Sequence, residues 1–140
     1  MVTMLDGSVE IIEHPGEVRL RLRAPALGGL AAVAGRALAE LELGRVPGLG
    51  AGAWRDVTVQ GRDPEALLVN WLNELIYLAE TERWVAVEFT VDGVTETGLR
   101  MRARGIPVDE APSRVKAATL HGLRIASVAD GIEADLVLDV

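Results

Sequence analysis

Three oxygen-bearing positions lie near the two ends of the sequence. Glu17 follows the turn-forming pair Pro15 and Gly16, Asp139 is the penultimate residue, and Val140 carries the α-carboxylate. If the strand ends that carry these groups meet, they form an oxygen-rich cluster suited to a hard cation such as Ca²⁺ or Mg²⁺. Spacing alone leaves a second interpretation open, in which these are ordinary solvated surface acids.

The two histidines are the only groups whose unperturbed pKa lies near neutral pH. His14 precedes Pro15, and His121 falls in a β-like stretch near the C-terminus. For each of them we expect a structural hydrogen bond at a strand end. A small metal-dependent hydrolase built on Glu17, Asp139 and His121 would also need a positioned nucleophile and oxyanion donors, and no such motif is recognisable.

Two sets of arginines recur with a period of two, so each set lines one face of a strand. A basic face of this kind would suit an acidic partner or a phosphate backbone. We expect instead that these arginines pair with acids on neighbouring strands, such as Glu133 and Asp135. The two sets are Arg19, Arg21 and Arg23, and Arg100, Arg102 and Arg104.

One helix, from Asp63 to about Glu80, is expected to position the other elements. Asp63 suits the N-cap, and Pro64 suits the first helical position. Residues 70, 73 and 74 (Asn, Asn and Glu) are expected to satisfy loops packed on the helix rather than to bind a ligand. A broad apolar face at helical spacing predicts burial; it consists of Leu68, Trp71, Leu72, Leu75 and Ala79.

The remaining segments are short and half-apolar. A strand with strict alternation is predicted from Glu17 to Ala24 and a helix from Pro25 to Leu43. Hairpins are predicted around Asp92-Gly93 and around residues 129–131. The order β-(β)-α-β-α-β-β-β-β predicts a single α+β domain over residues 1–140, with two helices packed on mixed or antiparallel sheet. The strands flanking the hairpin turns are predicted at residues 84–91, 94–103, 116–128 and 132–139.

Composition narrows the class of protein. The chain has 140 residues, a hydrophobic fraction of 49%, no cysteine and a formal charge of −7 at pH 7. The acidic balance argues against autonomous nucleic-acid binding, because phosphate neutralisation requires a basic surface. We find neither a membrane-spanning stretch nor a secretory signal, so we expect a cytoplasmic protein.

Four segments resemble the archease family, in the right order and over essentially the whole chain. The opening EHPGEV (13–18) resembles the family's EHTADV, and LLVNWLNELIYL (67–78) resembles its LLYNFLNELLFL helix. The stretch VKAATLHGLRI (115–125) resembles a family strand of the form VKAVTYHxLxI, and the terminal VLDV resembles the family's VxD(I/L) ending. The helix and the third segment are the most specific.

The resemblance implies an accessory protein rather than an enzyme. Archeases assist the RtcB-type, GTP-dependent RNA ligase of tRNA splicing and RNA repair by promoting its guanylylation and turnover. In the family a divalent cation is held by the aspartate of the opening motif, the penultimate aspartate and the last residue. The matching positions are Glu17, Asp139 and Val140, and the cation implied is Ca²⁺, Mg²⁺ or Mn²⁺.

The opening motif departs from the family pattern, since Pro-Gly-Glu replaces Thr-Ala-Asp at positions 15–17. Glutamate still offers two hard oxygens, but they lie one methylene further from the backbone, so metal distance and denticity must change. An alternative hypothesis follows: a chaperone-like or structural adaptor that serves another client protein, with the metal site altered or lost.

Overall fold

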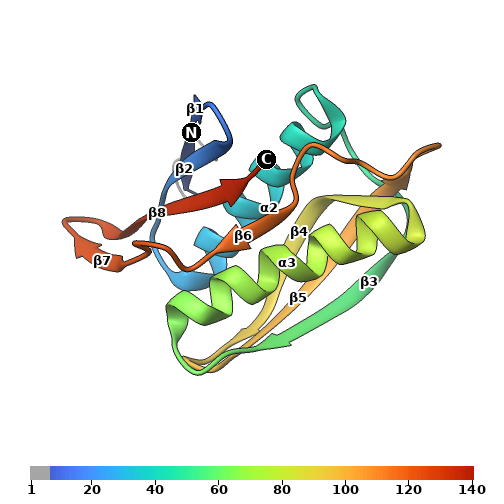
Figure 1. The fold of residues 1–140 in the computed structure, drawn as a ribbon. Helices are drawn as coiled ribbons and strands as arrows, with labels where there is room; N and C mark the ends of the chain where they lie inside the picture. The colour runs from blue at the N-terminus through green and yellow to red at the C-terminus, as the bar shows by residue number, and fades with distance from the viewer. Residues whose placement is uncertain (1–6) are drawn as a thin grey trace.

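The computed structural model describes residues 7–140, which form ten helices and strands. In chain order they are β1 (Ser8–His14), β2 (Glu17–Ala24), α2 (Leu27–Leu43), β3 (Ala51–Gln60), α3 (Pro64–Glu82), β4 (Trp84–Val94), β5 (Gly98–Pro107), β6 (Ala117–Thr119), β7 (Ile125–Val128) and β8 (Gly131–Asp139). Figure 1 shows this arrangement.

The strands form two sheets, and every pair among the described residues is antiparallel. The larger sheet has the order β1-β2-β8-β6, with β7 also pairing with β8, and the smaller has the order β3-β5-β4. Helix α3 packs against β4, β6 and β3, while α2 packs against β4 and β2. The α+β prediction is therefore confirmed, with purely antiparallel sheets.

Helix α3 begins as its sequence predicts. The Asp63 carboxylate accepts a hydrogen bond from the Ala66 N–H at 2.8 Å, and Pro64 occupies the first turn. This bond satisfies one of the N–H groups that a helix start leaves without an intrahelical partner.

Helix α3 runs to Glu82 and contributes much of the core. The largest side chains at 1% exposure or less include Trp71, Leu67 and Leu72 of α3, Leu30 and Leu38 of α2, Leu20 and Leu22 of β2, and Leu136 and Leu138 of β8.

The first predicted hairpin exists, but its turn lies elsewhere. Strand β4 continues through Asp92-Gly93 to Val94, and the turn falls at 95–97, where the Thr95 N–H donates to the Gly98 carbonyl at 2.8 Å. A register shift between Val91 and Gly93 marks a bulge at Asp92. Placing the turn at Asp92-Gly93 was wrong, because pairing with β5 continues past the bulge and this pair bends the strand instead.

The strand predicted over residues 116–128 is divided. It forms β6 and β7, which both pair with β8, and a turn separates them. In this turn Gly122 adopts a φ of +67°, and the Leu123 N–H donates to the Leu120 carbonyl at 3.0 Å. A left-handed residue cannot continue an extended strand, so prediction of one long strand was wrong. The second hairpin, between β7 and β8, is confirmed.

Candidate metal centre

A tight turn places Glu17 at the start of β2. Pro15 and Gly16 connect β1 to β2, and Gly16 has a φ of +81°. Proline followed by a residue with positive φ is the pattern of a type II turn. The turn closes with His14 directly opposite Glu17 in the β1–β2 register.

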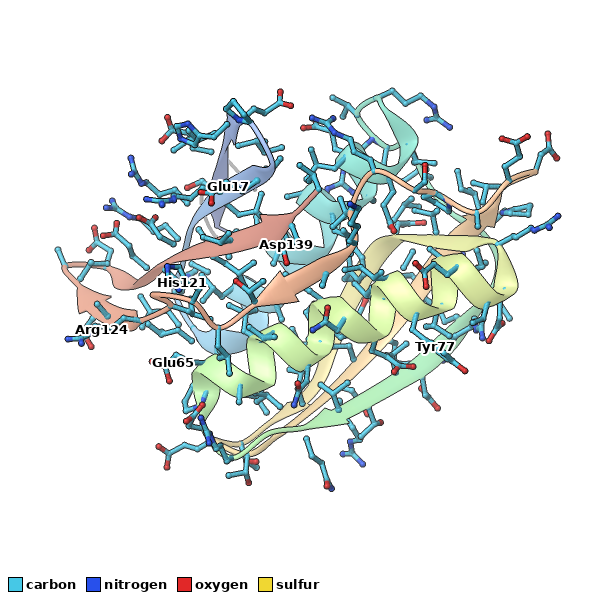
Figure 2. All side chains as sticks on the ribbon, in the orientation of Figure 1. Glu17, Glu65, Tyr77, His121, Arg124 and Asp139 are labelled. Carbon is cyan, nitrogen blue, oxygen red and sulfur yellow. The ribbon has the colours of Figure 1, made fainter. Side chains whose placement is uncertain are left out.

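The end of β8 meets this turn. Asp139 lies directly opposite Glu17 of β2, and the Val140 N–H donates to the Gly16 carbonyl at 3.3 Å. On its other side Asp139 pairs with β6, and its carbonyl accepts the Lys116 N–H at 2.8 Å. The predicted Glu17, Asp139 and Val140 are thus brought together at one end of the larger sheet; Figure 2 labels the two acids.

Register also fixes which face these side chains occupy. Residues directly opposite one another in an antiparallel pair project from the same face of the sheet. His14, Glu17 and Asp139 therefore share one face at three adjacent strand positions. His14 was not among the predicted metal ligands, and only the pairing of β1 with β2 shows its proximity to Glu17.

The donor chemistry fits a hard divalent cation, with one restriction. Within residues 7–140 no three His, Cys, Asp or Glu side chains form a metal-binding group. The two carboxylates would therefore need further oxygens, and Val140, whose N–H donates to the carbonyl of Gly16 next to Glu17, carries the nearest candidate in sequence. The Glu17 carboxylate also lies 3.8 Å from the Arg19 guanidinium, at the margin of an ion pair that a cation would have to displace.

His121 does not join the two carboxylates. It lies in the turn that follows β6. The last residue of β6, Thr119, pairs with Val137 of β8. The chain at His121 has therefore moved past Val137, away from the Asp139 end of β8. The described residues contain no three-membered group of Glu17, Asp139 and His121 that would hold a metal, so the geometry gives the hydrolase hypothesis no support.

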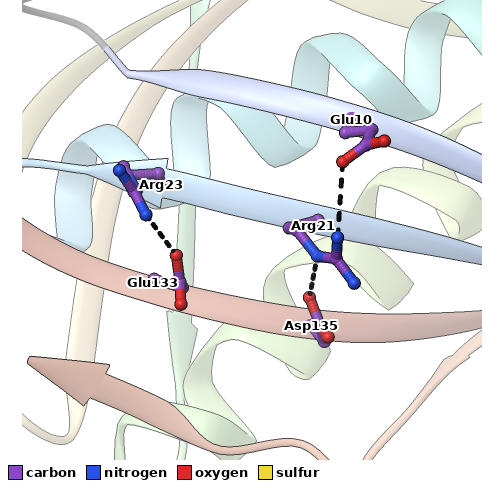
Figure 3. A network of polar contacts seen from close by, with 5 residues as sticks. All are labelled: Glu10, Arg21, Arg23, Glu133 and Asp135. Carbon is purple, nitrogen blue, oxygen red and sulfur yellow. Dashed lines mark hydrogen bonds and ion pairs between the residues drawn. The ribbon is translucent and has the colours of Figure 1, made fainter. Parts of the chain in front are cut away.

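The expected pairing with acids on neighbouring strands is confirmed for five of the six arginines, whereas the ion pair of Arg19 is with Glu17 of its own strand. Figure 3 shows Arg21 between Asp135 at 3.2 Å and Glu10 at 3.5 Å, and Arg23 at 2.7 Å from Glu133. The hydrogen bond from the Arg21 guanidinium to Asp135, together with the charge of that carboxylate, raises the pKa of Arg21. In the smaller sheet the pairs are Arg100 with Asp92, Arg102 with Asp56 and Arg104 with Glu88.

One pair in the smaller sheet also holds the loop between α2 and β3. The Glu88 carboxylate accepts the Gly50 N–H at 2.7 Å and the Arg104 guanidinium at 3.1 Å. The Gly50 bond first, and the arginine second, lower the pKa of Glu88. Gly50 thus ties the loop between α2 and β3 to β4, which carries Glu88.

Three polar residues of α3 bond the backbone of neighbouring segments. The Asn70 amide donates to the Gln60 carbonyl at 2.8 Å, and the Asn73 amide bonds both backbone groups of Ala118. Both asparagines thus satisfy packed backbone groups as predicted, but these groups belong to strands, β3 and β6, rather than to loops. Glu65, at the start of the helix, accepts the Ile125 N–H at 3.0 Å, a contact that the sequence did not indicate.

Comparison with known proteins decides the family. The model of the Archease protein family matches residues 10–140. The chain belongs to the archease family. The resemblance found in the four sequence segments is therefore confirmed.

Named archeases share about a third of the aligned residues with this archease-family chain. The protein from Methanosarcina barkeri is 33% identical over 97 residues, covering 61% of this chain and 64% of that protein. The protein from Archaeoglobus fulgidus is 36% identical over 98 residues, covering 65% of this chain and 71% of that protein. The matched region thus spans just under two thirds of the first relative and somewhat more of the second.

Solved archease-family structures share the fold. Protein 1598 of Methanobacterium thermoautotrophicum aligns with a TM-score of 0.68 and 22% identity, over 94% of this chain and 98% of that one. An archease of Thermotoga maritima, described as a possible chaperone, aligns with a TM-score of 0.65 and 16% identity, over 94% and 96% of the two chains. In the part of this chain that the structure describes, no helix is long and apolar enough to cross a membrane.

Proposed function

We propose that this archease-family protein is a non-catalytic accessory protein that activates an RtcB-type, GTP-dependent RNA ligase in tRNA splicing or RNA repair. It would promote guanylylation and turnover of the ligase through direct protein contact. The observation that carries the proposal is the pairing of Glu17 with Asp139, beside the bond from the Val140 N–H to the Gly16 carbonyl. These contacts bring three positions, which the family resemblance implies as metal ligands, to one end of the larger sheet.

The acidic tip, which we define as Glu17, Asp139 and Val140, would hold a divalent cation through hard oxygen atoms. When bound, the cation would supply positive charge at an exposed end of the molecule, where a partner protein can approach. The sheet itself would orient the tip, because Asp139 lies between β2 and β6 and Val140 is bonded to the β1–β2 turn. Calcium, magnesium and manganese all prefer ligands of this type.

We expect Asp139→Asn to reduce stimulation of the cognate ligase by about tenfold or more, since it removes a ligand charge while keeping the shape of the side chain. Ligase turnover is measured while the purified protein is titrated. Asp130→Asn is the matched control, because it makes the same change at an exposed position before the opposite end of β8. A ligase whose turnover stays constant across the titration of the parent protein would contradict the proposal.

The departure at residues 15–17 favours a second function, that of an adaptor or chaperone for a different client. Here the acidic tip would not be needed for partner capture. We then expect Glu17→Ala and Asp139→Ala to retain the same client in a pull-down as the parent protein. Loss of an RNA ligase from the captured proteins in both variants would instead favour ligase activation through the tip.

A further inference from the structure

Strand β6 is held from both sides, although within residues 7–140 only one side has a β-strand partner. It has three residues, Ala117–Thr119, and pairs with the end of β8. On its other side Asn73 of α3 takes the place of a neighbouring strand. The Ala118 N–H donates to the Asn73 Oδ1 at 2.8 Å, and the Asn73 Nδ2 donates to the Ala118 carbonyl at 3.2 Å.

A side-chain amide is suited to this contact because it offers one acceptor and one donor group, as a peptide unit does. Both backbone groups of Ala118 are occupied by Asn73. The flanking residues of β6 accordingly face β8, where Ala117 pairs with Asp139 and Thr119 pairs with Val137. By bonding the backbone of Ala118, the Asn73 amide leaves the neighbouring residues Ala117 and Thr119 to pair with the last residues of β8.

A series of contacts, from α3 through β6 to Asp139, connects the core to the acidic tip. Asn73 follows the fully buried Trp71 and Leu72 on α3, so its backbone position is fixed by the core. From Ala118 the chain runs back to Lys116, whose N–H donates to the Asp139 carbonyl at 2.8 Å. Asp139 is thus held between β2 on one side and a short strand anchored to α3 on the other.

We propose that Asn73 is a positioning residue of the acidic tip. It holds β6 against β8 and thereby keeps Asp139 and Val140 beside Glu17. The effect on cation affinity rests on the proposed function, whereas the effect on the order of the β8 end does not. The two parts are therefore measured separately.

Asn73→Ala is compared with Asn70→Ala, a matched change on the same helix. Asn70 also bonds a backbone carbonyl, that of Gln60, but this contact has no connection to β6. Hydrogen exchange of the Lys116 amide reports the bond to Asp139, and calorimetric titration with Ca²⁺ reports the tip. We expect Asn73→Ala to reduce protection of Lys116 by about tenfold or more and Ca²⁺ affinity by about 10–100-fold. Asn70→Ala should change neither quantity.

Asn73→Asp serves as a second variant with nearly the same shape. It can accept the Ala118 N–H but cannot donate to the Ala118 carbonyl when ionised. We expect its Lys116 amide to be less protected than in the parent, and asparagine at position 73 to be required for full protection. Circular dichroism and thermal melting of each variant verify that α3 and the core remain folded.

The outcomes separate the positioning role of Asn73 from the presence of a Ca²⁺ site at the acidic tip. Parental protection of Lys116 in folded Asn73→Ala or Asn73→Asp would overturn the positioning role of Asn73. If protection falls in these variants while the parent itself binds no Ca²⁺, the positioning role stands and a Ca²⁺ site at the tip is excluded. Parental Ca²⁺ affinity in a variant that has lost protection would show that the order of β8 does not control the tip.

Discussion

Trp71→Ala is expected to lower the free energy of unfolding by about 3–5 kcal/mol, the usual cost of deleting a buried aromatic side chain. Trp71 is 0% exposed, and its indole N–H donates to the Ala31 carbonyl at 2.8 Å. Its ring also meets that of Phe89 edge-on, with centroids 5.7 Å apart. The substitution therefore leaves a cavity and removes a contact between the two helices at the same time.

Tyr77→Ala is the control, since it truncates another aromatic residue of α3 whose side chain points to solvent. Tyr77 is 58% exposed, so we expect its loss to change the unfolding free energy by about 0.5 kcal/mol or less. Urea denaturation of the parent and both variants measures the difference. Similar losses for the two substitutions would show that α3 is not the centre of the core.

Glu42→Gln is expected to stabilise the protein at alkaline pH. Burial of its carboxyl first, and the negative charge of Glu80 second, raise the pKa of Glu42 from 4.5 to about 8. Between these two values the folded protein retains a proton that the unfolded chain has released. The stability of the parent therefore falls as pH rises from about 4.5 and levels off above about 8.

Glutamine cannot ionise, so the variant should lose this part of the pH dependence. At pH 9 we expect it to exceed the parent by on the order of 3 kcal/mol in unfolding free energy, and to differ little from it near pH 4. Urea denaturation at a series of pH values makes the measurement. Glu96→Gln, at an exposed position in the β4–β5 turn, should follow the parent. Parallel pH curves for the parent and Glu42→Gln would contradict the raised pKa.

The raised pKa of Glu42 is a property that the sequence pattern does not predict. Nothing in the residues around it distinguishes it from the other acids near the end of α2. Its raised pKa depends on the packing of that helix beside Glu80 of α3. Burial and charge proximity are properties of the assembled core, so sequence alone could not predict this group.

The two wrong strand boundaries have a similar cause. Asp92-Gly93 has the local preference of a turn, but β4 continues its pairing with β5 beyond it, and the Asp92 carboxylate lies 3.6 Å from Arg100. In the stretch before β7, the positive φ of Gly122 separates two strands that share one partner. Partner strands decided both boundaries, and a single sequence does not show its partners.

The sequence by itself determined the features that depend on neighbouring residues. The Asp63 cap, the buried face of α3 and the alternation of β2 follow from local spacing, and the motifs identified the family. Only the tertiary structure decided which distant groups meet. Glu17 and Asp139 come from opposite ends of the chain, and they become neighbours because β2 pairs with β8 in one register. A one-residue slip would turn one of these side chains to the other face, so the packed core, rather than local propensity, determines the acidic tip.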